Sequence, residues 1–110
     1  MQTYNIVTEN ADNRIQEEEG EIIKINNVFI GVAAIVDWDD EDDEYTQYNV
    51  THLESGSLLV RLADTKEQAM ELATQKINLT NFDEVICVMS NNLMSIGVEY
   101  PVNDITKFKI

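Results

Sequence analysis

The segment that decides the fold is residues 45–78, with the sequence YTQYNVTHLESGSLLVRLADTKEQAMELATQKIN. Its first part contains two runs typical of strands, Tyr45 to Leu53 and Ser57 to Ala63, joined by Glu54-Ser55-Gly56. A three-residue loop with Gly56 in the left-handed region predicts a hairpin here, because a two-residue turn would scatter the apolar side chains over both faces. The side chains that this loop aligns on one face are Tyr48, Val50, His52, Leu58, Val60 and Leu62.

The second part of this segment predicts a helix. Asp64 is a favoured N-cap residue, and Glu67 three positions later completes a capping box. The apolar residues that follow at helical spacing are Ala69, Leu72, Ala73 and Ile77. We therefore expect a helix over about residues 65–77 that ends near Asn78, with Lys76 at the negative end of its dipole.

Two further hairpins are predicted on either side of this segment. In the first, Asn26-Asn27 separates Glu21–Ile25 from Val28–Val32, and asparagine tolerates the left-handed backbone that a two-residue loop requires. The side chains that this turn places on one face are Ile23, Ile25, Val28, Ile30 and Val32. The second hairpin turns near Asn91-Asn92 and is closed by Pro101. The side chains that it would align are Val85, Cys87, Met89, Met94, Ile96 and Val98.

Together these elements define an α+β domain, in which an antiparallel sheet built from hairpins carries one main helix on one face. Residues 107–110 alternate polar and apolar side chains, as a last strand would, and residues 1–20 are expected to be partly irregular. A chain of 110 residues with 44% hydrophobic residues fits a single domain over residues 1–110.

The formal net charge is −14, and it is unevenly distributed. Residues 1–54 hold 14 acidic and two basic residues, whereas residues 55–110 hold seven acidic and five basic residues. This excess argues against binding to nucleic-acid phosphates or to anionic lipid. Two clusters carry most of it: Glu17, Glu18, Glu19 and Glu21, and the run Asp37, Trp38, Asp39, Asp40, Glu41, Asp42, Asp43 and Glu44.

The sequence offers no specific metal site and no cofactor-binding pattern. Asp37, Asp39 and Glu41 alternate like the start of a calcium loop, but Asp42 occupies the position that needs glycine and Tyr48 the position of the bidentate glutamate. The glycines are isolated, so no phosphate-binding loop is present. Loose binding of divalent cations by the many carboxylates remains open.

We expect His52 and Cys87 to be scaffold residues and the protein to have no enzymatic activity. His52 lies near Ser55 and Ser57, but neither a nucleophile elbow nor an oxyanion loop surrounds it, so we interpret it as a strand residue at the sheet rim. Cys87 is predicted to be buried in an apolar strand, where a thiol is poorly nucleophilic. A single cysteine, with neither a signal peptide nor a long apolar run, indicates a cytoplasmic protein.

The acidic run from Asp37 to Glu44 must be solvated, because neighbouring carboxylates repel one another and cannot be buried. One interpretation is that the run only blunts a sheet edge and keeps the protein soluble. Another is a protein-binding patch, because Trp38, Tyr45 and Tyr48 lie in and beside the run, and aromatic anchors within a charged rim are typical of such patches. Trp38 is equally compatible with folding back on the core.

The spacing of these charges suggests nucleic-acid mimicry. The run has seven carboxylates in eight residues, which when extended span about 27 Å, or about one charge per 4 Å, against one per ~1.7 Å of duplex DNA. Carboxylates from Glu17 to Glu21, if close by, would bring the density nearer to that of a nucleic acid. A basic cleft that binds phosphates would then attract this surface.

In its size, its charge and these acidic residues, the chain resembles the small inhibitors carried by phages and other mobile elements, the anti-CRISPR and anti-restriction proteins that act as nucleic-acid mimics. The segment from Tyr48 to Ala73 also resembles parts of small phage proteins. The resemblance implies an inhibitor in the host cytoplasm that binds a basic nucleic-acid-binding surface of a host defence nuclease complex. The residues expected to bind this partner are Glu17, Glu18, Glu19, Asp37, Trp38, Asp39, Asp40, Glu41, Asp42, Asp43, Glu44 and Tyr45.

Other classes of function are consistent with the same sequence features. An immunity protein that neutralises a basic nuclease toxin is also small and acidic, and it also uses a carboxylate-rich face with aromatic anchors. A small acidic subunit of a larger assembly and a metal-binding protein are further alternatives. The sequence does not separate these four classes.

Overall fold

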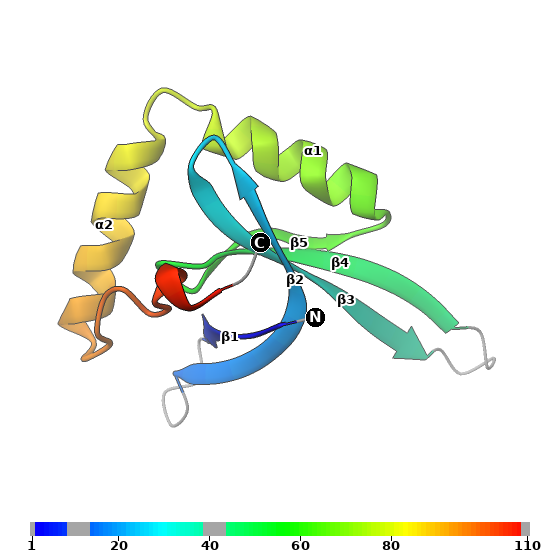
Figure 1. Ribbon diagram of the computed structural model, residues 1–110, viewed down its shortest axis with the longest axis horizontal. Coiled ribbons are helices and arrows are strands. Elements are labelled where there is room, and N and C mark those ends of the chain that lie inside the picture. Colours follow the sequence, from blue (N-terminus) through cyan, green and yellow to red (C-terminus); the bar gives the residue numbers. More distant parts are fainter. Residues whose placement is uncertain (1, 9–13, 39–43, 109–110) are drawn as a thin grey trace.

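One antiparallel sheet followed by two helices makes up the fold in the computed structural model, which describes residues 2–8, 14–38 and 44–108 (Figure 1). The strands are β1 (Gln2–Val7), β2 (Ile15–Ile25), β3 (Val28–Trp38), β4 (Glu44–His52) and β5 (Ser57–Ala63). The helices are α1 (Lys66–Ile77), α2 (Phe82–Ser95) and a short 3-10 helix, η1 (Ile105–Lys107). Each strand pairs with the next in the order β1-β2-β3-β4-β5, which is a meander. The predicted α+β class with an antiparallel sheet is confirmed.

The hairpin between β2 and β3 forms as the sequence predicts. Asn26 and Asn27 have φ angles of 47° and 67°, the left-handed conformation that a two-residue hairpin loop requires. The resulting register pairs Ile25 with Val28 and Ile23 with Ile30. The apolar face that follows from this register belongs to the main core, in which Ile30 is fully buried.

In the loop between β4 and β5, Gly56 has the predicted left-handed conformation, with a φ angle of 66°. The predicted length of three residues is wrong, because His52 rather than Leu53 pairs with Ser57 and the loop has four residues. Val50 pairs with Val60 as expected, but the register shifts on both sides of Val50. Such bulges interrupt the alternation of side chains along a strand. Consequently Leu58 and Leu62 are 45% and 41% exposed, and the prediction that they share the apolar face is wrong.

Helix α1 begins one residue later than predicted and ends where expected. Its N-cap is Thr65 rather than Asp64, and the Thr65 hydroxyl accepts a hydrogen bond from the Gln68 backbone N–H at 3.0 Å. The C-cap is Asn78. The residues that α1 buries against the sheet are Ala69, Ala73 and Ile77.

The sheet has a core on each face. Under α1, the fully or nearly fully buried residues include Ile30, Val50, Val60 and Ala63. On the other face, Tyr4, Ile22 and Leu53 form a smaller cluster with partly buried residues from η1 and the segment after it. The ring of Tyr4 lies so close to Gly31 that a Cβ atom there would stand 2.5 Å from the ring, so only glycine fits at this position. The single-domain prediction for residues 1–110 remains an expectation.

The predicted hairpin over residues 85–98 is wrong, because these residues belong mainly to a second helix. Phe82, Ile86 and Leu93 lie on one side of α2, and Phe82 packs into the main core beneath α1. Alternate positions of a strand and one face of a helix can both collect apolar residues in a short run, so the pattern is ambiguous. As one result, Cys87 is exposed and the prediction of a buried thiol is also wrong.

The two ends of the described chain form β1 with the start of β2, and η1. Residues 1–20 were expected to be partly irregular; within them β1 and the start of β2 pair with each other, from Gln2 with Gly20 to Val7 with Ile15, and residues 9–13 lie outside the described residues. Instead of a last strand at residues 107–110, the chain forms η1, and Lys109 and Ile110 lie outside the described residues.

Candidate functional site

The far half of the β3–β4 hairpin extends beyond the packed body of the protein (Figure 1). We call this part the acidic arm and define it as residues 34–38 and 44–47. The pairing continues without interruption from Ala34 with Tyr48 to Trp38 with Glu44. Ala34 and Val36 are exposed, the latter by 47%, so the buried part of β3 ends at Ala33.

The two ends of the acidic run lie at the far end of this arm. Asp37 pairs with Tyr45, and Trp38 pairs with Glu44, so the run starts and ends in the last two paired rows of the hairpin. The central residues of the predicted site, Asp39, Asp40, Glu41, Asp42 and Asp43, lie outside the described residues, as do the side chains of Asp37, Trp38, Glu44 and Tyr45.

Tyr48, the third aromatic residue near the run, is a structural residue. Its side chain is half-buried and packs against the main core beneath α1. The aromatic residues that remain as candidates for partner contact on the arm are therefore Trp38 and Tyr45.

The second acidic cluster lies on a different part of the sheet. Beyond Glu21, which pairs with Val32, β2 leaves β3, and Glu17, Glu18 and Glu19 pair with β1. Because side chains alternate along a strand, Glu18 lies on the face opposite to Glu17 and Glu19. The three residues therefore form no continuous surface with one another.

Glu18 is also engaged within the protein. It accepts a hydrogen bond from the Tyr4 hydroxyl at 3.2 Å. Partial burial raises the pKa of Glu18, and the hydrogen bond from Tyr4 offsets part of this effect. Burial, together with the negative charge of Glu18, raises the pKa of Tyr4. Glu17 and Glu19 are exposed and are available to a partner.

In the part of the chain that the structure describes, few negative charges are compensated by a nearby basic group. Among the described residues, the one ion pair joins Lys66 of α1 to Glu21 of β2 at 2.5 Å, and the hydrogen bond in it raises the pKa of Lys66. The same part of the chain contains no group of three or more His, Cys, Asp or Glu side chains arranged to hold a metal ion. None of its helices is long and apolar enough to cross a bilayer.

His52 has the surroundings of a scaffold residue. It is 4% exposed, its ring packs edge-on against Phe82 with centroids 5.8 Å apart, and its Nδ1 lies 2.7 Å from the Ser55 hydroxyl. Nδ1 also accepts a hydrogen bond from the Ser55 backbone N–H at 3.3 Å, and burial lowers the pKa of His52 to about 4. The imidazole therefore stays neutral at pH 7 and fixes the turn at Gly56.

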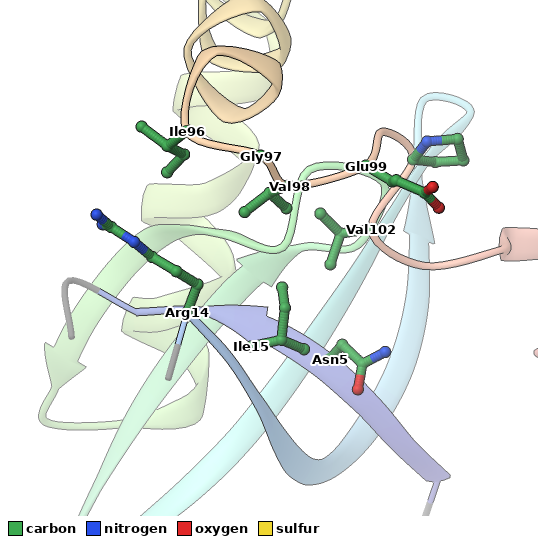
Figure 2. A pocket seen from close by; sticks show the side chains of 9 residues that line it. Asn5, Arg14, Ile15, Ile96, Gly97, Val98, Glu99 and Val102 are labelled. Carbon is green, nitrogen blue, oxygen red and sulfur yellow. The ribbon is translucent and has the colours of Figure 1, made fainter. Parts of the chain in front are cut away.

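A feature that the sequence reasoning missed is a cavity of about 390 Å³ between the N-terminal strands and the end of α2 (Figure 2). Its lining includes Asn5, Arg14, Ile15, Ile96, Val98 and Val102. The cavity brings together residues that are up to 97 positions apart, between Asn5 and Val102. Arg14 is one of only two basic residues in residues 1–54. This scarcity is the only feature of the sequence that could have marked Arg14 as a candidate site residue.

The comparisons with known proteins return no family, since no protein-family model, no curated protein and no solved structure matches the chain.

Proposed function

We propose that this protein is an inhibitor that binds a basic nucleic-acid-binding surface of a defence nuclease complex and does so through the acidic arm. The observation that carries the proposal is the position of the acidic run, which begins and ends at the tip of a paired hairpin that extends beyond the core. A cleft that accommodates a nucleic acid admits a narrow projection more easily than a flat sheet face.

The charge of the protein supports the same function. With a net charge of −14 and a single internal ion pair among the described residues, most carboxylates are available to attract a basic partner. Long-range attraction of this kind raises association rates by 10- to 1000-fold or so and weakens as salt screens it. A run that served solubility alone would not need a paired hairpin arm to present it.

The first experiment identifies the partner and tests the mode of binding together. The tagged protein captures proteins from a host lysate at low and at moderate salt, and bound proteins are then challenged with duplex DNA. We expect at least one basic nucleic-acid-binding protein to be retained at low salt and to be displaced by the DNA. Recovery of no such protein at low salt contradicts the proposal.

The second experiment measures association and dissociation rates with the captured partner at two salt concentrations. The arm variant replaces four acids of the run: Asp39→Asn, Asp40→Asn, Asp42→Asn and Asp43→Asn. The control variant removes the same number of charges from the helices: Glu67→Gln, Glu71→Gln, Asp83→Asn and Glu84→Gln.

We expect the arm variant to associate at least tenfold more slowly at low salt and to lose most of its salt dependence, because steering depends on where the charge lies. The control variant should change the association rate much less. Equal effects of the two variants would show that net charge alone matters and that the arm is not the binding element.

A further inference from the structure

The cavity near the end of α2 combines a cationic group with apolar walls. Arg14 is half-buried at one side of the cavity, and among the described residues its guanidinium has no ion pair. Figure 2 shows Arg14 and Ile96 at one side of the opening, Val102 and Glu99 at the other, and Ile15 and Val98 between the two sides. An unpaired arginine beside apolar side chains in a protein of net charge −14 is a recognition feature that the acidic arm does not use.

The walls of the cavity are held in place by hydrogen bonds. The Asn103 side chain accepts from the Asn5 backbone N–H at 2.7 Å and donates to the Asn5 carbonyl at 2.8 Å, which fixes β1 against the C-terminal segment. The Val98 backbone N–H donates to the Leu93 carbonyl at 2.9 Å, which fixes the chain after α2. Val98 itself is 8% exposed, so this lining residue is also packed against the protein.

The chemistry of this lining selects a class of ligand. Arginine binds carboxylates with two parallel hydrogen bonds, and the amide of Asn5 adds a neutral polar group to the lining. The volume of about 390 Å³ lies within the range of pockets for small organic ligands. Apolar walls favour an apolar body behind the carboxylate, whereas the net charge of −14 and Glu99 at the rim disfavour a doubly charged phosphate.

We infer that this cavity binds a singly charged carboxylate attached to an apolar body, with the carboxylate on Arg14 and the apolar part against Ile96, Val98 and Val102. This inference does not depend on the proposed function of the acidic arm. Two sources offer this chemistry, a free carboxylic acid and the C-terminal residue of a peptide.

The test uses three probes and the intact protein. Octanoate represents a free carboxylic acid, N-acetyl-leucine represents a peptide C-terminus, and N-acetyl-leucinamide has the same shape without the charge. Each is titrated to about 10 mM, which detects dissociation constants in the millimolar range, while amide chemical shifts are followed by NMR. We expect at least one carboxylate to shift the amides of Gly97 and Val98, and whichever binds more tightly identifies the source.

The variants are Arg14→Gln and, as a matched control, Arg61→Gln on β5, which lies outside the cavity. A charged hydrogen-bonded pair of this kind changes affinity about tenfold or more, so we expect Arg14→Gln to weaken carboxylate binding by at least that factor. Arg61→Gln should leave it unchanged. The amide spectrum of each variant without ligand reports whether the fold is retained.

Three results overturn the inference. The first is that neither carboxylate shifts the cavity amides. The second is that the neutral amide binds as tightly as N-acetyl-leucine. The third is that the folded Arg14→Gln variant binds as the parent does, or that both arginine variants lose binding equally.

Discussion

His52 combines a buried position with hydrogen bonds that require the neutral imidazole. Because Nδ1 accepts from the Ser55 backbone N–H, a proton on Nδ1 would remove that acceptor and place a charge beside Phe82. Both effects disfavour the protonated form, which agrees with the lowered pKa of about 4. The sequence indicated a scaffold role for His52 from the lack of catalytic neighbours, but not the hydrogen bonds that give it this role.

This geometry predicts how stability depends on pH. The unfolded chain binds a proton at His52 near its ordinary pKa of 6.5, whereas the folded protein does so only near pH 4. Stability from this group is therefore fully present above about pH 6.5 and falls as the pH decreases toward 4, by up to about 3 kcal/mol. Urea unfolding of the parent and of His52→Gln at pH 7, 6 and 5 measures the difference in slope.

The control for this prediction is internal, because His52 is the only histidine in the chain. The variant is expected to be less stable at every pH but to lack the decrease between pH 6.5 and 5. An imidazole that titrates in the folded protein at or above pH 6.5, as seen by NMR, would contradict the prediction.

At the level of elements, the sequence predicts the left-handed residues Asn26, Asn27 and Gly56, but it does not distinguish a strand from a helix over residues 85–98. Asn26-Asn27 and Gly56 specify their turns locally, since few residues tolerate a positive φ. Residues 85–98 carry apolar side chains at both strand-like and helix-like spacing, and no local feature separates the two. What decides is tertiary: Phe82 fills a space beside His52 and α1, which a hairpin turning near Asn91 would leave empty.

This account of α2 predicts opposite outcomes for two of its apolar residues. Phe82 is 8% exposed and belongs to the main core, whereas Val88 is 58% exposed. Phe82→Ala should lower the free energy of unfolding by about 3 kcal/mol, and Val88→Ala should change it by less than about 0.5 kcal/mol. Chemical denaturation of both variants measures this, and a larger cost at Val88 than at Phe82 would indicate that α2 packs by its other face.

The two candidate sites differ in how far the sequence alone could predict them. The acidic run is continuous in the chain, and the repulsion between its carboxylates was enough to predict that it is solvated. The cavity at Arg14 forms only where β1, β2 and the segment after α2 come together in the fold. No spacing of residues in the sequence therefore predicts it. The same holds for Glu18, whose hydrogen bond to Tyr4 depends on the β1–β2 register.

On the scale of the whole molecule, the dominant feature is an excess of like charge. The described residues contain a single ion pair against a net charge of −14, and the molecule measures 43 × 33 × 26 Å. At 0.01 M salt the screening length is about 30 Å, which is comparable to these dimensions, so carboxylates on opposite sides repel one another. At 0.1 M it falls to about 10 Å, and most of this repulsion is lost.

We therefore expect salt to stabilise the protein. Raising NaCl from about 0.01 M to about 0.3 M should increase the free energy of unfolding by about 1 kcal/mol, or Tm by about 4 °C, because screening weakens repulsion in the folded state most. The variant with Asn at positions 39, 40, 42 and 43 has a charge of −10 instead of −14. It should be at least as stable as the parent at low salt and should respond less to added salt.

Glu21→Gln provides the control for this prediction, because it also removes one negative charge but breaks the ion pair with Lys66. Its low-salt stability should show little or no increase, since the loss of a local attraction offsets the relief of repulsion. Thermal unfolding of the three proteins at both salt concentrations separates net charge from local pairing. Two results would contradict the prediction: a parent protein whose stability does not depend on salt, or an arm variant that is less stable than the parent at low salt. Either result would mean that the acidic run stabilises the fold instead of destabilising it.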